Sequence, residues 1–155
     1  MTSDGDRPTG LGARARQKVR QRAEAFIESA AVPHEPIVAG ALVVSGLSRK
    51  WVLLTPYIRL FGRSYYIALT EHYVLFCLMS GRTGRPVEVR IVEPRDQVRI
   101  TDVRLRLALS GGMGSMLCYV PGRPGPMTLR FFRIWRPEVE FLLGQLGPDQ
   151  AVPAG

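Results

Sequence analysis

The stretch YYIALTEHYVLF, residues Tyr65–Phe76, places two runs of aromatic, branched and other apolar residues on either side of Glu71 and His72. Such runs favour extended strands, and a short polar pair between them is typical of a tight hairpin connection. The sequence therefore predicts one strand over Tyr66–Thr70 and a second over Tyr73–Ser80. This hairpin indicates a mainly β domain.

Further short strands are expected on both sides of this hairpin. Residues 36–45 are apolar, and in residues 86–93 valine and isoleucine alternate with charged residues, which is the pattern of a half-buried strand. A slip in the alternation at Thr101 and Asp102 predicts a bulge or a turn between two strands. With the hairpin, these patterns give about seven strands, the others lying within residues 97–110, 116–120 and 127–134.

A helix is expected at each end of the strand region. Residues 13–31 place an apolar stripe beside arginine and lysine, which indicates a basic amphipathic helix that ends before Pro33. Near the other end, Pro137 occupies a first helical position, and Gly147 with Pro148 stops the helix. Its apolar residues recur at i, i+3, i+4 and i+7: Val139, Leu142, Leu143 and Leu146.

These elements define the domain organisation. We expect a disordered tail over 1–12, a basic amphipathic helix over 13–32, one β domain over 36–147, and a second tail over 148–155. Several antiparallel strands hide their edges best in a closed or nearly closed barrel. One amphipathic helix is enough to cover an open end of such a barrel.

The order of the elements resembles that of the bacterial pleckstrin-homology-like (PH-like, GRAM-like) domain family. The similarity lies in Tyr65–Phe76, in the strand that runs into a proline-containing turn at Val92–Val98, in the LRF run Leu129–Phe131, and in the final helix Pro137–Leu146. It covers roughly residues 36–147. The resemblance implies a PH-like antiparallel, partly open barrel of seven strands closed by a C-terminal α-helix. It also implies a binding or scaffolding role without catalysis.

The composition favours acidic partners. The chain carries a formal net charge of +8, and a basic excess attracts phospholipid headgroups, nucleic acids or acidic protein surfaces. Cys77 and Cys118 show no CxxC spacing and are too few for a disulfide framework, so we expect a reducing cytoplasm. The family resemblance implies that this cytoplasm is bacterial. The first residues lack the apolar run of a signal peptide, and none is expected.

Residues 48–66, SRKWVLLTPYIRLFGRSYY, are the most apolar and aromatic part of the chain. The run is long enough for a membrane span, but Arg59 lies near its centre and Arg63 follows one turn later. Each central arginine costs about 2.5–3.5 kcal/mol on insertion. Pro56 and Gly62 interrupt the run further, so a single-pass helix is excluded.

In the pleckstrin-homology fold, the long connection between the first and second strands often holds phosphoinositide headgroups through basic residues. The resemblance places residues 46–64 at this connection and therefore implies a site there. Tryptophan and tyrosine favour the membrane interface, and basic residues favour anionic headgroups. The candidate ligand-binding or membrane-binding residues are Arg49, Lys50, Trp51, Tyr57, Arg59, Phe61 and Arg63.

Other interpretations of residues 46–64 stay open: packing under the N-terminal helix, extension of a barrel strand, or a protein-docking surface such as a homodimer seam. The N-terminal helix itself either lies on the barrel or forms a basic arm. Arg90, Arg104, Arg106 and Arg130 alternate with apolar residues and are expected on one exterior face. Nucleic acid is not expected as a partner, because no ladder of exposed aromatic residues and no recognition helix accompany this face.

No residue pattern predicts catalysis. The chain lacks carboxylates paired for acid–base chemistry, His34 and His72 lack partners at metal-ligand spacing, and residues 111–115, GGMGS, lack the Lys-Ser/Thr of a phosphate-binding loop. We expect no enzyme activity, no cofactor and no metal.

The sequence thus predicts a non-catalytic PH-like binding module at the inner face of the cytoplasmic membrane or on a protein partner. Residues 46–64 and a basic surface would carry the binding, with anionic phospholipid or a protein as the partner. The alternative is a structural or oligomerisation subunit, such as a homo-oligomer, that buries the apolar residues 46–64 in a protein interface.

Overall fold

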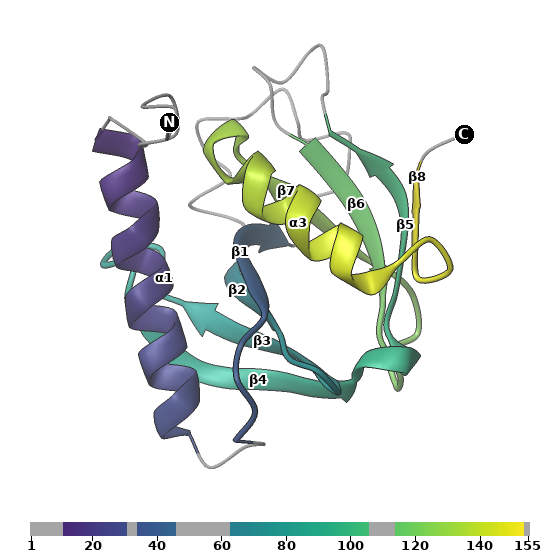
Figure 1. Cartoon of the computed structure of the whole chain (residues 1–155), viewed down its shortest axis with the longest axis horizontal. Helices are drawn as coiled ribbons and strands as arrows, with labels where there is room; N and C mark the ends of the chain where they lie inside the picture. The colour runs from purple at the N-terminus through teal and green to yellow at the C-terminus, as the bar shows by residue number, and fades with distance from the viewer. Residues whose placement is uncertain (1–10, 31–33, 46–62, 106–113, 154–155) are drawn as a thin grey trace, which may run out of the picture.

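The computed structural model describes residues 11–30, 34–45, 63–105 and 114–153. This part of the chain forms a β-sheet with two α-helices, α1 (Leu11–Ser29) and α3 (Arg136–Leu146) (Figure 1). Two short 3-10 helices, η3 (Arg95–Gln97) and η4 (Arg133–Trp135), precede β5 and α3. The strands are β1 (Ala39–Ser45), β2 (Arg63–Leu69), β3 (Tyr73–Met79), β4 (Pro86–Pro94), β5 (Arg99–Arg104), β6 (Gly114–Tyr119), β7 (Met127–Phe131) and β8 (Ala151–Pro153).

Within the described residues, the strands form one eight-stranded sheet in the order β4-β3-β2-β1-β7-β6-β5-β8. Strands β1–β4 form one antiparallel meander and β5–β7 a second. β1 joins the two, because it pairs with β2 along its length and with β7 at Val44 and Ser45. The edge strands β4 and β8 do not pair with each other, so the barrel is only partly closed.

The helices complete this architecture. Figure 1 shows α3 lying across β1 and β7, and α1 standing beside the meander β1–β4. The expected fold class is therefore confirmed: the protein has a mainly β, PH-like, partly open antiparallel barrel with a C-terminal helix and an additional N-terminal helix.

The predicted hairpin forms the centre of the sheet. Ile67 pairs with Phe76 across β2 and β3, and the N–H of Thr70 donates to the carbonyl oxygen of Tyr73 at 2.9 Å, which closes the tight connection. Every residue of Tyr65–Leu69 is at most 2% exposed. Since alternate strand residues point to opposite faces, this continuous burial means that both faces of β2 are covered.

The slip in the alternation after Ile100 is a bulge inside β5. The register between β5 and β6 shifts between Thr101 and Arg104, and Asp102 has a φ of 51°. The short polar side chain of aspartate tolerates this left-handed backbone better than a branched side chain does. One bulged strand, rather than two strands separated by a turn, therefore covers Arg99–Arg104.

The helix α1 packs on the barrel through part of its predicted apolar stripe. Ala23 is fully buried and Ile27 is 4% exposed, while Val19 and Phe26 pack against the core from its margin. The side chain of Glu24 accepts a hydrogen bond from the Tyr66 hydroxyl at 3.3 Å, which links α1 to β2. Of the two arrangements considered for this helix, the structure shows the one that lies on the barrel.

The helix α3 follows its predicted pattern. Val139, Leu142 and Leu146 are buried, and Gly147 ends the helix with a φ of 84°. The N–H of Gly147 donates to the carbonyl oxygen of Leu143 at 3.2 Å, so this carbonyl at the helix end is satisfied.

The segment after α3, expected as a tail over 148–155, contains the strand β8. Its Ala151 lies opposite Ile100 in a parallel pairing with β5, and the N–H of Ile100 donates to the carbonyl oxygen of Gln150 at 2.7 Å. The Gln150 side chain donates to the carbonyl oxygens of Arg95 and Val98. These bonds satisfy backbone groups that β5 would otherwise leave open at the sheet edge.

The expectation of an exterior Arg130 is wrong. Arg130 lies on β7 and is only 2% exposed, and its neighbours Leu129 and Phe131 are fully buried. Alternation assigns a residue to one face of a strand, but it does not reveal that both faces of β7 are covered. Arg90 and Arg104 are exposed as expected, and Arg106 lies outside the described residues.

Candidate functional site

The predicted binding segment begins and ends at one point of the sheet. Ser45, the last residue of β1, lies opposite Arg63, the first residue of β2. Ser45 also pairs with Leu129 of β7, so the chain leaves β1 where the two meanders meet. Arg63 is exposed. The other six predicted site residues lie outside the described residues: Arg49, Lys50, Trp51, Tyr57, Arg59 and Phe61.

The β3–β4 turn lies at the same end of the meander. Ser64 of β2 pairs with Met79, and residues 80–85 then reverse the chain through hydrogen bonds between Ser80 and Arg85 at 2.8 Å and between Ser80 and Gly84 at 2.9 Å. This turn exposes Arg82 and Arg85. Both arginines therefore lie at the end of the meander where β2 begins.

Sequence analysis did not identify Arg82 and Arg85 as site residues. The predicted strands over Tyr73–Ser80 and residues 86–93 imply a connection at residues 81–85, but this connection was not related to the one between the first two strands. The usable signal is connectivity: in an antiparallel meander, the first and third connections leave the sheet at the same end. The strand order implied by the family resemblance is therefore enough to predict that these two connections lie at the same end of the sheet.

A groove of about 540 Å³ lies between α1, η4, the β3–β4 turn and the adjoining ends of β1, β2 and β3. Its apolar part comes from Val19, Leu42, Val44, Met79 and Trp135. None of its described lining residues is acidic, and two are arginines. The full lining comprises Ala15, Arg16, Val19, Leu42, Val44, Ser64, Met79, Ser80, Gly81, Arg82, Thr83, Gly84, Phe132, Ile134 and Trp135.

Specific contacts hold the walls of this groove together. The Arg16 guanidinium of α1 donates to the carbonyl oxygen of Ile134 and, at 3.2 Å, to the Glu138 carboxylate. The rings of Tyr66 and Trp135 meet edge to face with centroids 6.3 Å apart, which joins β2 to η4. Burial raises the pKa of the Tyr66 hydroxyl, so it stays neutral and donates to Glu24. The groove therefore has fixed sides.

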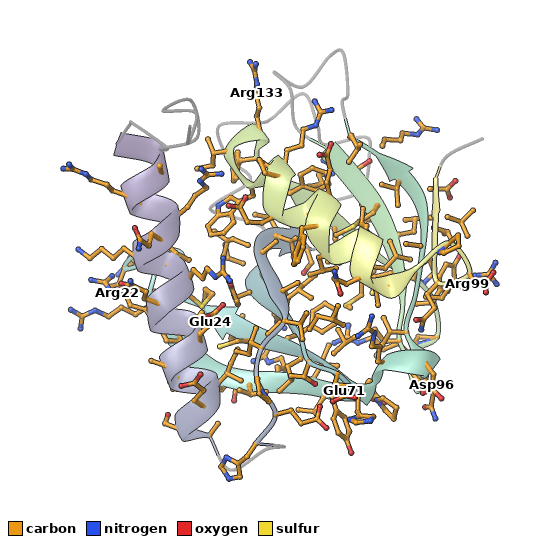
Figure 2. All side chains as sticks on the ribbon, viewed as in Figure 1. Arg22, Glu24, Glu71, Asp96, Arg99 and Arg133 are labelled. Atoms are coloured by element: carbon orange, nitrogen blue, oxygen red, sulfur yellow. The ribbon has the colours of Figure 1, made fainter. Side chains whose placement is uncertain are left out.

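Arginine and lysine side chains are exposed on α1 and η4, and acidic side chains are exposed on the β2–β3 turn and η3. Figure 2 shows Arg22 on the outer side of α1, and Arg133 at the opposite end of the molecule from Glu71 and Asp96. Arg14, Lys18 and Arg22 follow one another at i, i+4 and i+8, so they share one side of α1. Of these three, Arg14 and Lys18 are exposed.

A second depression, of about 590 Å³, contains the polar cluster at the far end. The Glu35 carboxylate accepts hydrogen bonds from the Thr70 hydroxyl at 2.8 Å and from the His72 N–H at 3.0 Å, and lies 2.7 Å from His72 Nδ1. Glu71, Asp96 and Arg95 also line this depression. Because Glu35 precedes β1 and His72 belongs to the β2–β3 turn, the cluster ties the entry of the sheet to its central hairpin.

This cluster predicts a pH-dependent contribution to stability. The Thr70 hydrogen bond holds the pKa of Glu35 below its ordinary value of 4.5, so the contribution of Glu35 is present above pH 4.5 and is lost as the pH falls through the lowered pKa. The Glu35 hydrogen bond holds the pKa of His72 above 6.5, so its contribution is present below pH 6.5 and is lost as the pH rises through the raised pKa.

We therefore expect Glu35→Gln to destabilise the protein most between about pH 5 and 6, where both contributions are complete. Urea unfolding midpoints of wild type and variant at about pH 3.5, 5.5 and 8.5 measure this difference. Glu28→Gln, an exposed carboxylate on α1, serves as the control and should show a flat, small difference. An equally flat profile for Glu35→Gln would contradict the assignment.

The two thiols do not form a reactive site. Burial raises the pKa of Cys77 to about 11 and that of Cys118 to about 12, so both remain neutral at ordinary pH. A neutral buried thiol is a poor nucleophile and a poor metal ligand. Among the described residues, no group of three or more His, Cys, Asp or Glu side chains is arranged to hold a metal ion.

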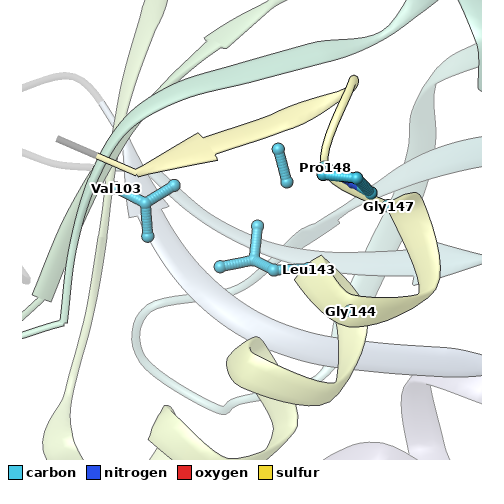
Figure 3. Close-up of a pocket in the computed structure, with 6 residues that line it drawn as sticks. Val103, Leu143, Gly144, Gly147 and Pro148 are labelled. Atoms are coloured by element: carbon cyan, nitrogen blue, oxygen red, sulfur yellow. The ribbon is translucent and has the colours of Figure 1, made fainter. Parts of the chain in front are cut away.

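A third, apolar hollow of about 310 Å³ lies between the end of α3 and the strands β5 and β8. Figure 3 shows Val103 and Leu143 on its sides, with Gly147 and Pro148 where the chain turns from the helix to β8. It contains no charged lining residue among those described, which distinguishes it from the basic groove.

Comparison with known proteins gives similarity to solved structures. Neither a protein-family model nor a curated protein matches the sequence. The crystal structure of the complex of PDZ-RhoGEF DH/PH domains with GTP-γ-S-activated RhoA is similar with a TM-score of 0.47 and 10% sequence identity, over 89% of this chain and 39% of that chain. The present chain thus spans well under half of that one. The PH-like fold of this protein is evident from its own strand order and C-terminal helix.

In the part of the chain that the structure describes, neither helix combines the length and apolar character needed to cross a membrane.

Proposed function

We propose that the protein is a non-catalytic binding module of the bacterial cytoplasm that attaches to the anionic inner face of the cytoplasmic membrane. The observation that carries the proposal is the convergence of basic residues at one end of the sheet. Ser45 and Arg63, which flank residues 46–62 in the chain, pair at this end of the sheet, and the exposed Arg82 and Arg85 lie on the β3–β4 turn at the same end.

The chemistry of this end suits a lipid surface. Each lysine or arginine close to an anionic leaflet contributes about 1 kcal/mol of attraction. The segment adds the aromatic residues Trp51, Tyr57 and Phe61, which favour the interface between headgroups and acyl chains. Weak attraction at each of several cations, together with a few apolar anchors, gives reversible attachment that depends on salt.

The proposal predicts that Arg49→Ser/Lys50→Ser weakens binding to anionic vesicles by about tenfold or more, since two cations contribute about 2 kcal/mol. Co-sedimentation with phosphatidylglycerol-containing and with neutral phosphatidylcholine vesicles, at low and high salt, measures this. The matched control is Arg99→Ser/Arg104→Ser, which removes two exposed arginines from β5.

We expect wild type and control to bind only the anionic vesicles and to lose binding at high salt. Equal binding of the Arg49/Lys50 variant and the wild type would remove the electrostatic part of the proposal. Absence of binding to either vesicle type, with a larger species in light scattering after size exclusion, would support the alternative in which residues 46–64 are buried in an oligomer.

A further inference from the structure

We propose that the groove between α1, η4 and the β3–β4 turn docks an acidic segment of a partner protein, which inserts apolar side chains between these elements. This second binding surface goes beyond membrane attachment. It consists of described residues and does not require any residue of the segment 46–62.

The groove has apolar surface that the described residues leave exposed. Ile134 on η4 is 48% exposed, and Val19, Leu42 and Phe132 are half-buried at its sides. A volume of about 540 Å³ lies within the range of pockets that accept ligand groups of a few side chains. Trp135 and Met79 close its bottom, and both are nearly fully buried. Apolar anchor residues of a partner would gain burial here without a change in the fold.

Cations line the groove on α1 and on the β3–β4 turn, whereas β1 and β3 carry none. Arg16 and Arg82 line it directly. Four more cations are chain neighbours of lining residues: Arg14 and Lys18 on α1, Arg63 at the start of β2, and Arg133 on η4. All four are exposed, and no described lining residue is acidic.

This distribution of charge favours an acidic peptide as the ligand of the groove. The two lining cations, Arg16 and Arg82, lie on different elements beside an apolar centre, and Arg16 already pairs with Glu138, whereas a single lipid headgroup would need several cations directed at one point. A peptide with alternating apolar and acidic residues matches both the apolar centre and the spread rim. A second copy of this chain brings a net charge of +8 toward the same surface, and repulsion between two such molecules opposes that pairing.

The test uses the full chain and a displayed library of 14-residue peptides in which Leu, Phe, Glu, Asp, Lys and Ser vary at every position. Peptides enriched on the wild type are synthesised with a fluorescent label and titrated by anisotropy at low and high salt. Two variants probe the groove: Ile134→Ser removes exposed apolar surface, and Arg82→Glu reverses a rim charge. Their controls are Val87→Ser on β4, which is 53% exposed against 48% for Ile134, and Arg99→Glu on β5.

We expect the enriched peptides to contain apolar residues spaced among acidic ones. Each groove variant should weaken their binding by about tenfold, and each control by less than about twofold. High salt should weaken wild-type binding, because the rim is exposed. Ile134→Ser should keep its binding to anionic vesicles, which separates this surface from membrane attachment.

Three results would overturn the proposal: no peptide is enriched, the enriched peptides lack acidic residues, or groove variants and controls bind them equally. If the peptides compete with vesicles and Ile134→Ser loses vesicle binding, the groove belongs to the membrane site and the docking proposal is wrong. If wild type binds the peptides but no vesicle, the docking proposal stands and the membrane proposal fails.

Discussion

Trp135→Ala is expected to lower the free energy of unfolding by about 3–5 kcal/mol, the range typical of removing a large aromatic side chain from a core. Trp135 is 3% exposed and its ring meets that of Tyr66 edge to face, at an interplanar angle of 78°. Tyr66 in turn contacts Glu24 of α1. The loss of the indole therefore leaves a cavity at the point where η4, β2 and α1 meet.

Urea unfolding, followed by far-UV circular dichroism, measures this change. The neighbouring Ile134 is 48% exposed, so Ile134→Ala should cost about 1 kcal/mol or less. Trp135→Phe keeps an aromatic ring against Tyr66 and should lose less than Trp135→Ala. A Trp135→Ala variant as stable as Ile134→Ala would show that the indole is not part of the core.

Gly114→Ala is expected to cost about 3 kcal/mol, at the upper end of the usual range for overpacking. A Cβ atom built on Gly114 would come closer than 3.0 Å to the ring of Phe131, a separation that real Cβ atoms essentially never show. Phe131 is fully buried and is the register partner of Gly114 across β6 and β7.

The same substitution at Gly144 is the matched control. A Cβ on Gly144 meets nothing within 4 Å, and the residue lies inside α3, so Gly144→Ala should stabilise the protein by about 0.5–1 kcal/mol. Phe131→Leu replaces the ring that obstructs the new methyl group with a smaller side chain. In the double variant, Gly114→Ala should therefore cost less than it does alone. Strictly additive effects would mean that Phe131 is not the obstacle.

The regular elements could be predicted because their patterns are local. The aromatic and branched runs around Glu71-His72 specify the central hairpin, and the spacing of Val139, Leu142 and Leu146 specifies the buried face of α3. The break at Thr101 was visible in the alternation, although only the pairing with β6 shows that it is a bulge. Each signal lies within one turn or a few strand positions.

Features that depend on distant contacts could not be predicted in this way. The strand β8 forms because β5 presents an open edge, and nothing in the composition of residues 148–155 indicates this. Arg130 alternates with apolar residues like an exterior residue, yet it lies on β7, a strand that is covered on both faces. Glu35 and His72 are far apart in the sequence. They come into contact only because the residues before β1 lie against the β2–β3 turn in the fold.

The difference between local patterns and distant contacts also explains how much of the candidate site could be predicted. Its predicted residues were chosen by composition within one segment, and of these the structure describes only Arg63. The groove, by contrast, is formed by residues from α1, three strands, a turn and η4, and few of them stand out in the sequence. Ile134 and Leu42 have no distinguishing feature in the sequence, and only the fold shows that both line the groove.

The two ends of the sheet limit how molecules of this protein associate. Along β5, the strand β8 occupies backbone groups that a strand from another molecule would need. Along β4, prolines stand at both ends, Pro86 and Pro94, and two register shifts distort the pairing with β3. Edge-to-edge growth into a continuous intermolecular sheet, the route to fibrous aggregates, is thereby discouraged at both ends. Among the described residues, the remaining sheet edges are the distorted β4 and the three-residue β8, which ends in a proline. Assembly of this part of the chain therefore favours side-chain contacts over shared backbone hydrogen bonds.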